Sequence, residues 1–170
     1  MITLKSLKTI ELKKKDIKEI CNLKNTFWKF GFDSNFLWFK KHIKKIDIHN
    51  LLYLRNELVG YTLLRNRSVF LNNNKKKYLY FDTLIIKKKF RNLKLSKILM
   101  TFNNEIIISK NKHSLLMCNF KLISFYKKFK WKVMSNKKII ILDHKIEGYK
   151  FMIFNFVRVN SIKNKYYLNK

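Results

Sequence analysis

The sequence contains no alanine, proline or glutamine, and its 170 residues include only three glycines and two cysteines. Cys21 and Cys118 lie far apart without metal-ligand spacing, which is typical of a reduced intracellular protein and not of a disulfide-stabilised secreted one. No apolar run approaches the ~18 residues that a membrane span needs, and residues 1–15 lack the long apolar core of a signal peptide. We therefore expect a cytoplasmic protein without a membrane partner.

Acidic residues are scarce as well, because 39 lysines and arginines face 10 aspartates and glutamates, for a formal net charge of +29. Such a charge ordinarily favours binding to nucleic acid or to an acidic membrane surface. A second cause competes, because alanine, proline and glycine use GC-rich codons, whereas the abundant lysine, asparagine, isoleucine, phenylalanine and tyrosine use AT-rich ones. An AT-rich genome explains much of this basic composition, so the charge is a weak indication of a nucleic-acid partner.

The apolar content of 47% is ample for one core, and the length fits one domain. After an edge strand in residues 1–10, two amphipathic helices are predicted. Asp16 is a suitable N-cap for the first helix, Gly31 and Asp33 interrupt the pattern, and Ser34 can cap the second helix. The residues expected to face inward are Ile17, Ile20, Leu23 and Phe27 in the first helix and Phe36, Leu37, Phe39, Ile43 and Ile46 in the second.

A β-hairpin is predicted around Arg55, Asn56 and Glu57, between strands at residues 51–54 and 58–64. Gly60 lies inside the second strand, where a retained glycine favours a bulge or a close backbone approach. The remaining predicted elements are a polar turn at 72–77, a buried central strand at 78–86, helices at 93–109 and 122–129, and strands at 115–118, 131–134, 139–142 and 151–157. Without an internal repeat or linker, these elements predict one domain at residues 1–160 and a polar tail at 161–170.

Cations gather where the central strand gives way to the following helix, at Lys87, Lys88, Lys89, Arg91 and Lys94. A helix N-terminus carries partial positive charge and unpaired N–H groups, so cations there are unfavourable unless an anion is bound. A phosphate-bearing ligand would supply that anion. The alternative is a solvated turn in a lysine-rich chain.

Residues 86–100, IKKKFRNLKLSKILM, resemble the acetyl-coenzyme A loop of the GCN5-related N-acetyltransferase (GNAT) superfamily. In that family an apolar strand end is followed by Arg/Gln-x-x-Gly-x-Gly/Ala and an apolar helix. Arg91 opens the motif, and Lys94 and Ser96 stand where the family prefers glycine.

Residues 115–131, LLMCNFKLISFYKKFKW, resemble the second signature of the family, a strand and a helix ending in Phe-Tyr-x-x-x-Gly-Phe/Trp. Phe125, Tyr126 and Trp131 match it, and Lys130 replaces its glycine. The order and separation of the two motifs make the pair more specific than either motif alone.

The resemblance implies an α/β fold with a GNAT-like mixed, mostly antiparallel sheet of about six to seven strands and helices on both faces. It also implies an N-acetyltransferase that moves an acetyl group from acetyl-coenzyme A, its co-substrate, to a primary amine, with a small molecule or amino sugar favoured over a protein. The residues expected to bind this co-substrate are Leu84, Ile85, Ile86, Arg91, Asn92, Leu93, Lys94, Leu95, Ser96, Asn119 and Tyr126.

Two residues are candidates for moving protons. The resemblance makes Tyr126 the general acid for the leaving thiolate, and a core aromatic is its alternative. Asp82 is the only carboxylate of the central strand and is expected to share a face with Leu84 and Ile86, so it is the candidate base. Other options remain for the base and the nucleophile: His113, His144 and Cys118.

The resemblance further implies that Trp28, Phe32 and Trp38 wall the acceptor site. No cluster of residues has metal-ligand spacing, so no metal is predicted. A basic nucleic-acid-binding protein and a catalytically inactive protein of the same fold are the alternative functions. The oligomeric state is open, a homodimer being one option.

Overall fold

The computed structural model describes residues 1–71, 74–134, 139–141, 148–155 and 166–168. It divides into two compact units, of which the first comprises Met1–Arg65 and Asp82–Asn103 and the second Asn66–Phe81 and Asn104–Lys170. Two long strands, β3 (Glu57–Leu71) and β4 (Asn74–Ile86), contribute to both units. The single domain over residues 1–160 stays a prediction.

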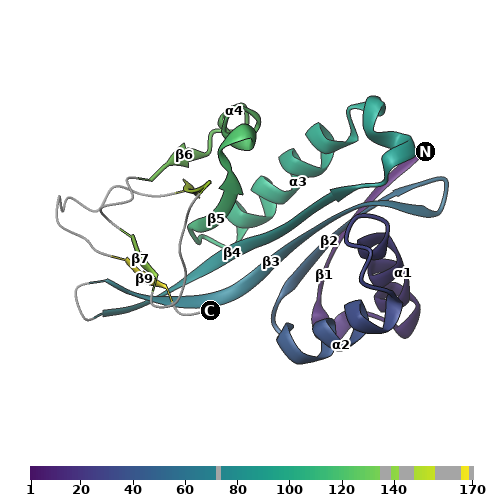
Figure 1. The fold of residues 1–170 in the computed structure, drawn as a ribbon, viewed down its shortest axis with the longest axis horizontal. Helices are drawn as coiled ribbons and strands as arrows, with labels where there is room; N and C mark the ends of the chain where they lie inside the picture. The colour runs from purple at the N-terminus through teal and green to yellow at the C-terminus, as the bar shows by residue number, and fades with distance from the viewer. Residues whose placement is uncertain (72–73, 135–138, 142–147, 156–165, 169–170) are drawn as a thin grey trace. The chain divides into compact units, whose positions relative to one another are not determined.

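The first unit is built on strands β1 (Ile2–Lys8) and β2 (Ile48–Leu54), followed by parts of β3 and β4 in that hydrogen-bonded order. Strand β2 is antiparallel to both β1 and β3. Figure 1 shows helices α1 (Lys14–Asn25) and α2 (Phe32–His42) on one side of these strands and the start of α3 (Leu95–Ser109) on the other. The short 3-10 helices of this unit are η1 (Thr9–Glu11) and η2 (Lys88–Leu93).

Strand alternation gives the first unit two separate cores. We call the side covered by α1 and α2 the helix-pair face and the other side the α3 face. The helix-pair face buries Leu51, Leu58, Tyr61, Leu63 and Ile85 against Ile20, Leu23 and Phe39. The α3 face buries Leu52, Val59 and Ile86 against Leu95 and Leu99. Neighbouring residues such as Leu51 and Leu52 therefore serve opposite faces.

The predicted hairpin is confirmed. Arg55 and Asn56 both have positive φ, 48° and 67°, as a two-residue turn between twisted strands requires. The β2–β3 register shifts beside Leu52, opposite Gly60. A Cβ on Gly60 would lie 2.9 Å from Ile86 Cδ1 and 3.2 Å from Leu52 Cβ. Gly60 thus lies beside the register shift and at a close approach of neighbouring side chains, as expected from a glycine inside a strand.

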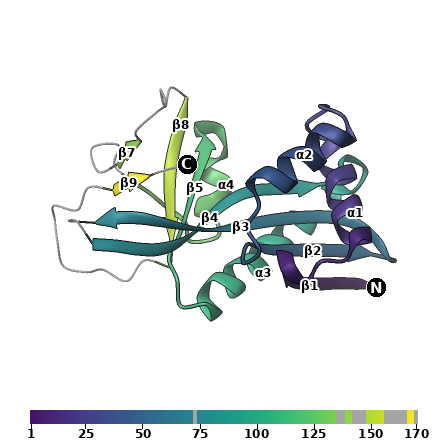
Figure 2. The ribbon, with the colours of Figure 1, turned by 90° about the horizontal axis from the view of Figure 1, so that it is seen from below.

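In the second unit, β4 pairs in parallel with β5 (Ser114–Asn119) through Leu79 and Tyr80. Strand β8 (Tyr149–Phe154) is antiparallel to β5, beside which it lies in Figure 2, and also to β6 (Lys132–Val133). Helices η3 (Phe120–Leu122) and α4 (Ile123–Lys127) follow β5. Strand β9 (Tyr166–Leu168) pairs with β7 (Ile139–Ile141) and with β3.

These pairings confirm the predicted fold class, because most are antiparallel and the sheet is mixed. Among the described residues, seven strands follow one another in the hydrogen-bonded order β1-β2-β3-β4-β5-β8-β6. Strands β7 and β9 lie off this path. No helix in the described ranges is both long and apolar enough to cross a membrane.

Several predicted helix boundaries are wrong. Asp16 lies inside α1, where its carboxylate accepts the Lys13 N–H at 2.8 Å, and α2 begins at Phe32 with Gly31 as its N-cap. Ser34 is therefore a residue within the helix. The 3-10 helix η2 occupies the start of the predicted third helix, so α3 begins at Leu95.

Three residues expected to face inward are exposed: Phe27 (53%), Leu37 (65%) and Ile46 (57%). Phe27 follows the end of α1 and Ile46 follows the end of α2, so helical spacing no longer governs where they point.

The polar segment expected to turn at residues 72–77 is also shorter than predicted, because β3 continues to Leu71 and β4 begins at Asn74. Cross-strand pairing outweighs the low strand propensity of asparagine and lysine here. Part of the expected polar tail likewise forms β9, which pairs with the end of β3.

Candidate active site

The corner between β4 and α3 keeps the backbone that the loop motif requires. Lys94 joins η2 to α3 in the left-handed conformation, with φ 55° and ψ 17°. Glycine enters this region without steric cost, and the family prefers glycine at this position. A right-handed segment followed by a left-handed residue turns successive N–H groups to one side and makes a concave site for an anion. Lys94 therefore adopts a backbone conformation in which glycine is otherwise favoured.

The charges around this corner are only partly neutralised within the chain. Neither η2 nor the first turn of α3 contains an acidic residue. Glu57 pairs with Lys87 and, at 3.0 Å, with Lys89. Hydrogen bonds from Lys87 and Lys89 lower the pKa of Glu57. Within the described residues, no carboxylate pairs with Arg91 or Lys94, and both are exposed.

Arg91 also holds the loop against the strand end. Its Nε donates to the Ile86 carbonyl at 3.3 Å, and its guanidinium carbon lies 5.7 Å from the centre of the Phe27 ring. The side chain thus spans from the end of β4 to the residues after α1.

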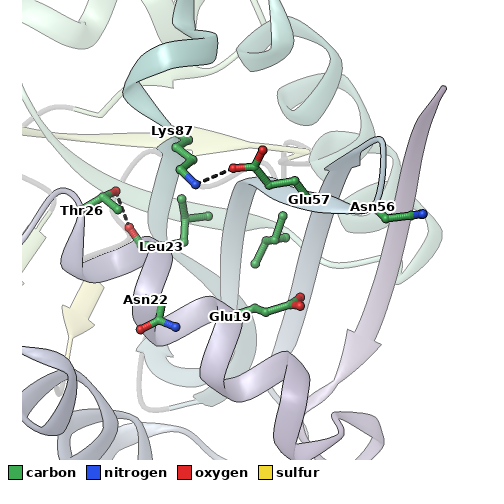
Figure 3. Close-up of a pocket in the computed structure, with 8 residues that line it drawn as sticks. Glu19, Asn22, Leu23, Thr26, Asn56, Glu57 and Lys87 are labelled. Carbon is green, nitrogen blue, oxygen red and sulfur yellow. Dashed lines mark hydrogen bonds and ion pairs between the residues drawn. The ribbon is translucent and has the colours of Figure 1, made fainter.

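A cavity of about 210 Å³ lies beside this corner (Figure 3). Its lining residues are Glu19, Asn22, Leu23, Thr26, Asn56, Glu57, Leu58 and Lys87. Figure 3 shows Lys87 pointing at Glu57, so these two charges already satisfy each other. The cavity is smaller than the ~300–1,000 Å³ typical of ligand sites, and we do not assign it a ligand.

A second charged group lies on the helix-pair face, where α1 buries the side chain of Lys24. This residue is 6% exposed, and its ammonium lies 3.6 Å from the ring centre of Trp38 and 5.7 Å from that of Trp28. Burial lowers the pKa of Lys24, and the negative charge of Asp82 opposes that effect. No salt bridge or hydrogen bond to the Lys24 ammonium occurs in the part of the chain that the structure describes.

Arg65 lies against the same tryptophan. Its Nη1 donates to Asp82 Oδ2 at 2.8 Å, its Nη2 donates to the His42 carbonyl at 3.3 Å, and its Cζ lies 5.5 Å from the Trp38 ring centre. The Nε atom of Arg65 is buried and has no hydrogen-bond partner in the part of the chain that the structure describes. We call Lys24, Trp28, Trp38, Arg65 and Asp82 the cation cluster.

The cation cluster is not balanced by its own groups. Removing an ammonium from water costs several kcal/mol, whereas a cation–π contact returns about 0.5–2 kcal/mol. Asp82 is already bonded to Arg65, which leaves two cations against one carboxylate. The arrangement therefore holds an excess positive charge at a mostly buried position.

The structure brings Trp28 and Trp38 together around Lys24 and stacks Phe32 on Phe36 at 5.9 Å in the same core, whereas their role as walls of an acceptor site stays a prediction. The predicted face of Asp82 is wrong. Leu84 and Ile86 pack on the α3 face, whereas Asp82 bonds Arg65 on the helix-pair face.

Lys24 and Arg65 were missed by the sequence reasoning, although the sequence held a signal for each. Lys24 continues the helical series of Ile17, Ile20 and Cys21, so it falls on the buried side of α1. Arg65 continues the strand series of Tyr61 and Leu63. Both residues are cations at positions where the spacing of apolar residues predicts a buried side chain.

In the second unit, Tyr126 lies in an aromatic cluster and is 8% exposed. Its ring contacts Phe81, Phe125 and Trp131 at centre distances of 6.1, 5.2 and 6.3 Å. Burial, followed by the effect of Cys118, raises the pKa of Tyr126 well above its ordinary value. The phenol therefore stays protonated at neutral pH.

The other candidates of the second unit have structural contacts. Cys118 lies 3.8 Å from the Met152 sulfur, and burial raises the pKa of its thiol, so a nucleophilic role is disfavoured. Asn119 caps η3 by accepting the Lys121 N–H at 3.0 Å. The His113 ring stacks on Tyr78, and burial lowers its pKa.

His144 lies outside the described residues. Among the residues described, no three His, Cys, Asp or Glu side chains gather as metal ligands would.

The amino-acid sequence matches no family model, and it matches no curated protein. Its structure resembles that of ElaA from Escherichia coli, with a TM-score of 0.67 and 17% identity over 90% of this chain and 99% of that one. It also resembles the ribosomal-protein-S18-alanine N-acetyltransferase from Escherichia coli (TM-score 0.64, 10% identity, 96% and 100% covered). A third similar structure is Arabidopsis thaliana Naa50 in complex with the bisubstrate analogue CoA-Ac-MVNAL (TM-score 0.58, 16% identity, 91% and 99% covered).

These likenesses concern the fold, since the identities are low. The chain has the fold of the GNAT superfamily, which confirms what its two motifs indicated.

Proposed function

We propose that this chain, which has the GNAT fold, is an N-acetyltransferase that moves an acetyl group from acetyl-coenzyme A to a primary amine. The observation that carries the proposal is the left-handed Lys94 between η2 and α3, in a cationic corner without an acidic residue in either helix start. The resemblance to N-acetyltransferases of known structure supports it.

The residues of the corner fit a diphosphate. The backbone N–H groups of residues 91–96 supply the concave anion site, and the exposed side chain of Lys94 leaves that backbone accessible. Leu84, Ile85 and Ile86 supply a strand end that can hold the amides of the pantetheine arm as an added strand would, and the Asn119 side chain offers a further polar group. Bound acetyl-coenzyme A would supply the thioester whose acetyl group is transferred.

The chain's own residues then handle two protons. Asp82, oriented by Arg65, accepts a proton from the acceptor ammonium directly or through a water molecule, because only the neutral amine attacks. Tyr126 donates its hydroxyl proton to the sulfur as the carbon–sulfur bond breaks, because burial keeps the phenol protonated at neutral pH. Trp28, Phe32 and Trp38 wall the acceptor, for which a small amine or an amino sugar is favoured over a protein.

Binding is tested by thermal unfolding in the presence of coenzyme A and, separately, of an oligonucleotide at equal concentration. Coenzyme A should raise the melting temperature, and Arg91→Glu should reduce that rise. Lys18→Glu is the matched control, because it makes the same charge change at an exposed position of α1. Stabilisation by the oligonucleotide alone would overturn the proposal in favour of nucleic-acid binding.

Catalysis is tested by the release of free thiol from acetyl-coenzyme A across a panel of primary amines. Tyr126→Phe should slow turnover about 10²-fold or more while leaving coenzyme A binding intact. Tyr149→Phe, at an exposed tyrosine of the same unit, is the control. A chain that binds coenzyme A but releases no thiol with any amine would be an inactive protein of this fold.

A further inference from the structure

We propose that Lys24 and Arg65, placed against Trp38, bind an anionic group of the acceptor, so that the amine substrate also carries a carboxylate or a phosphate. The inference rests on the proposed function and specifies the chemical class of its acceptor.

The first argument is the charge of the cation cluster. Lys24 and Arg65 are two cations against Asp82, and Lys24 is almost fully buried. An anion entering the cluster would balance this charge.

The second argument is the set of donors left without an acceptor. The Lys24 ammonium has no hydrogen bond within the described chain, and the buried Nε of Arg65 has none either. Both cations lie against the ring of Trp38, at 3.6 and 5.5 Å from its centre. An anion that met both donors would be held in the way that charged hydrogen-bond donors hold a carboxylate or phosphate.

The third argument is the order of groups along β4. The diphosphate is proposed to bind at residues 91–96 and the pantetheine arm along Ile86 to Leu84. Asp82 follows next in the same direction, so it lies toward the thioester end of the arm. An acceptor whose amine approaches Asp82 would have its anionic group within reach of Arg65, which Asp82 contacts, and of Lys24.

A purely structural role makes the opposite prediction for stability. If contacts with the two tryptophans alone stabilise the buried ammonium, replacing Lys24 by methionine should lower the melting temperature. If the ammonium is held for a ligand, Lys24→Met should raise it, because a methionine of similar length fills the site without needing water.

The experiment measures binding of two matched probe pairs by tryptophan fluorescence at constant ionic strength. One pair is 3-aminopropanoate against propylamine, and the other is phosphoethanolamine against ethanolamine. The wild-type chain should bind the anionic member of at least one pair about tenfold more tightly, and the pair that shows it identifies carboxylate or phosphate. Lys24→Met should abolish the preference and raise the melting temperature, whereas the exposed-site control Lys18→Met should keep the preference.

Equal affinity for both members of each pair would overturn the inference. A Lys24→Met variant that keeps the preference for the anionic probe would also overturn it. If Lys24→Met melts at a lower temperature or fails to fold, Lys24→Arg is measured in its place, and the inference is overturned when Lys24→Arg recovers neither the fold nor the preference. Coenzyme A stabilisation and thiol release report on the proposed function separately. Loss of the anion preference with coenzyme A binding intact contradicts only the acceptor class, and the reverse result contradicts only the enzyme.

Discussion

The two faces of the strands in the first unit bury polar side chains in different ways. On the α3 face, Asn103 Oδ1 accepts hydrogen bonds from Asn50 at 2.9 Å and from Thr62 at 2.8 Å, so three neutral residues bind one another. Two further atoms of this network, Asn50 Oδ1 and Asn103 Nδ2, have no partner among the described residues. On the helix-pair face, Lys24 and Arg65 are charged, and in the described part of the chain neither the Lys24 ammonium nor Arg65 Nε has a hydrogen-bond acceptor.

A neutral group that finds its partners inside the chain holds elements in place and needs no ligand. A charged group that lacks a partner destabilises the chain until something binds to it. The difference between the faces is therefore one of charge: the neutral network binds mainly within the chain, whereas the two cations are available to an anion.

The largest expected effect comes from lowering the pH, which should weaken the helix-pair face alone. Burial, and secondly the charge of Lys24, lowers the pKa of His49 from 6.5 to about 3. The unfolded chain therefore takes up a proton between pH 6.5 and about 3 that the folded chain excludes, and the free energy of unfolding falls by about 1.4 kcal/mol per pH unit in this window. His49 is neutral in the fold, with Nδ1 2.8 Å from the Tyr61 hydroxyl and Nε2 2.9 Å from Thr9 Oγ1.

Urea unfolding at several pH values checks this prediction. The His49→Leu variant shows how stability depends on pH through all the other titrating groups. The stability difference between wild type and variant should shrink as the pH falls below 6.5. Parallel stability curves would show that His49 is not the group responsible.

Asn103→Ala should destabilise the packing on the α3 face and lower the free energy of unfolding by about 3 kcal/mol. The substitution removes the oxygen that accepts from Asn50 and Thr62. The buried Thr62 hydroxyl would lose that acceptor, and Asn50 Nδ2 would keep only its bond to Thr62 Oγ1. Urea unfolding measures the loss, and Asn22→Ala at an exposed position of α1 should change stability by less than ~0.5 kcal/mol. An equal loss in the free energy of unfolding for both variants would show that the network does not stabilise the fold.

Gly60→Ala sharpens the comparison, because the added methyl would strain only the α3 face. Its Cβ would meet Ile86 Cδ1 at 2.9 Å and Leu99 Cδ2 at 3.1 Å, so a loss of about 2 kcal/mol is expected from overpacking. Adding Ile86→Val removes the nearest atom, and the double variant should lose less than the two single losses added together. Strict additivity in chemical denaturation would contradict the close contact.

The smallest effect is expected at the hairpin turn that joins the strands of both faces. Arg55→Gly should raise the free energy of unfolding by about 0.5 kcal/mol, because an L-residue with positive φ is strained and glycine is not. Arg67→Gly, in the extended part of β3, is the opposite control and should destabilise. A melting temperature that falls in the Arg55 variant would show that its side chain matters more than its backbone.

The sequence predicted the fold class, the hairpin and the special position of Gly60, because these depend on local pattern and turn chemistry. It misplaced the start of α2 because Gly31, which ends one helical pattern, also serves as the N-cap of the next helix. The face of Asp82 was wrong because uniform alternation was assumed along β4, whereas contacts with Arg65 place it opposite to Leu84.

The candidate site was only partly predictable. The loop at Arg91 and the aromatic residues Trp28 and Trp38 could be identified from motif and resemblance. Lys24 could not be singled out by composition, since lysine is abundant throughout the chain, although its place in the apolar series of α1 indicates burial. Its contact with the Trp38 ring could not be predicted, because that contact depends on how α1 and α2 pack.

The length of β3 and β4 gives the shift beside Gly60 a wider importance. Moving a strand along its neighbour by one position exchanges every inward and outward side chain, and these two strands contribute to both units. A slip there would turn Arg65 toward the apolar side and the leucines toward the cations, and it would disturb the second unit as well. The crowded position of Gly60 opposes that slip, because any other residue of β3 moved there would bring a Cβ against Ile86 and Leu52.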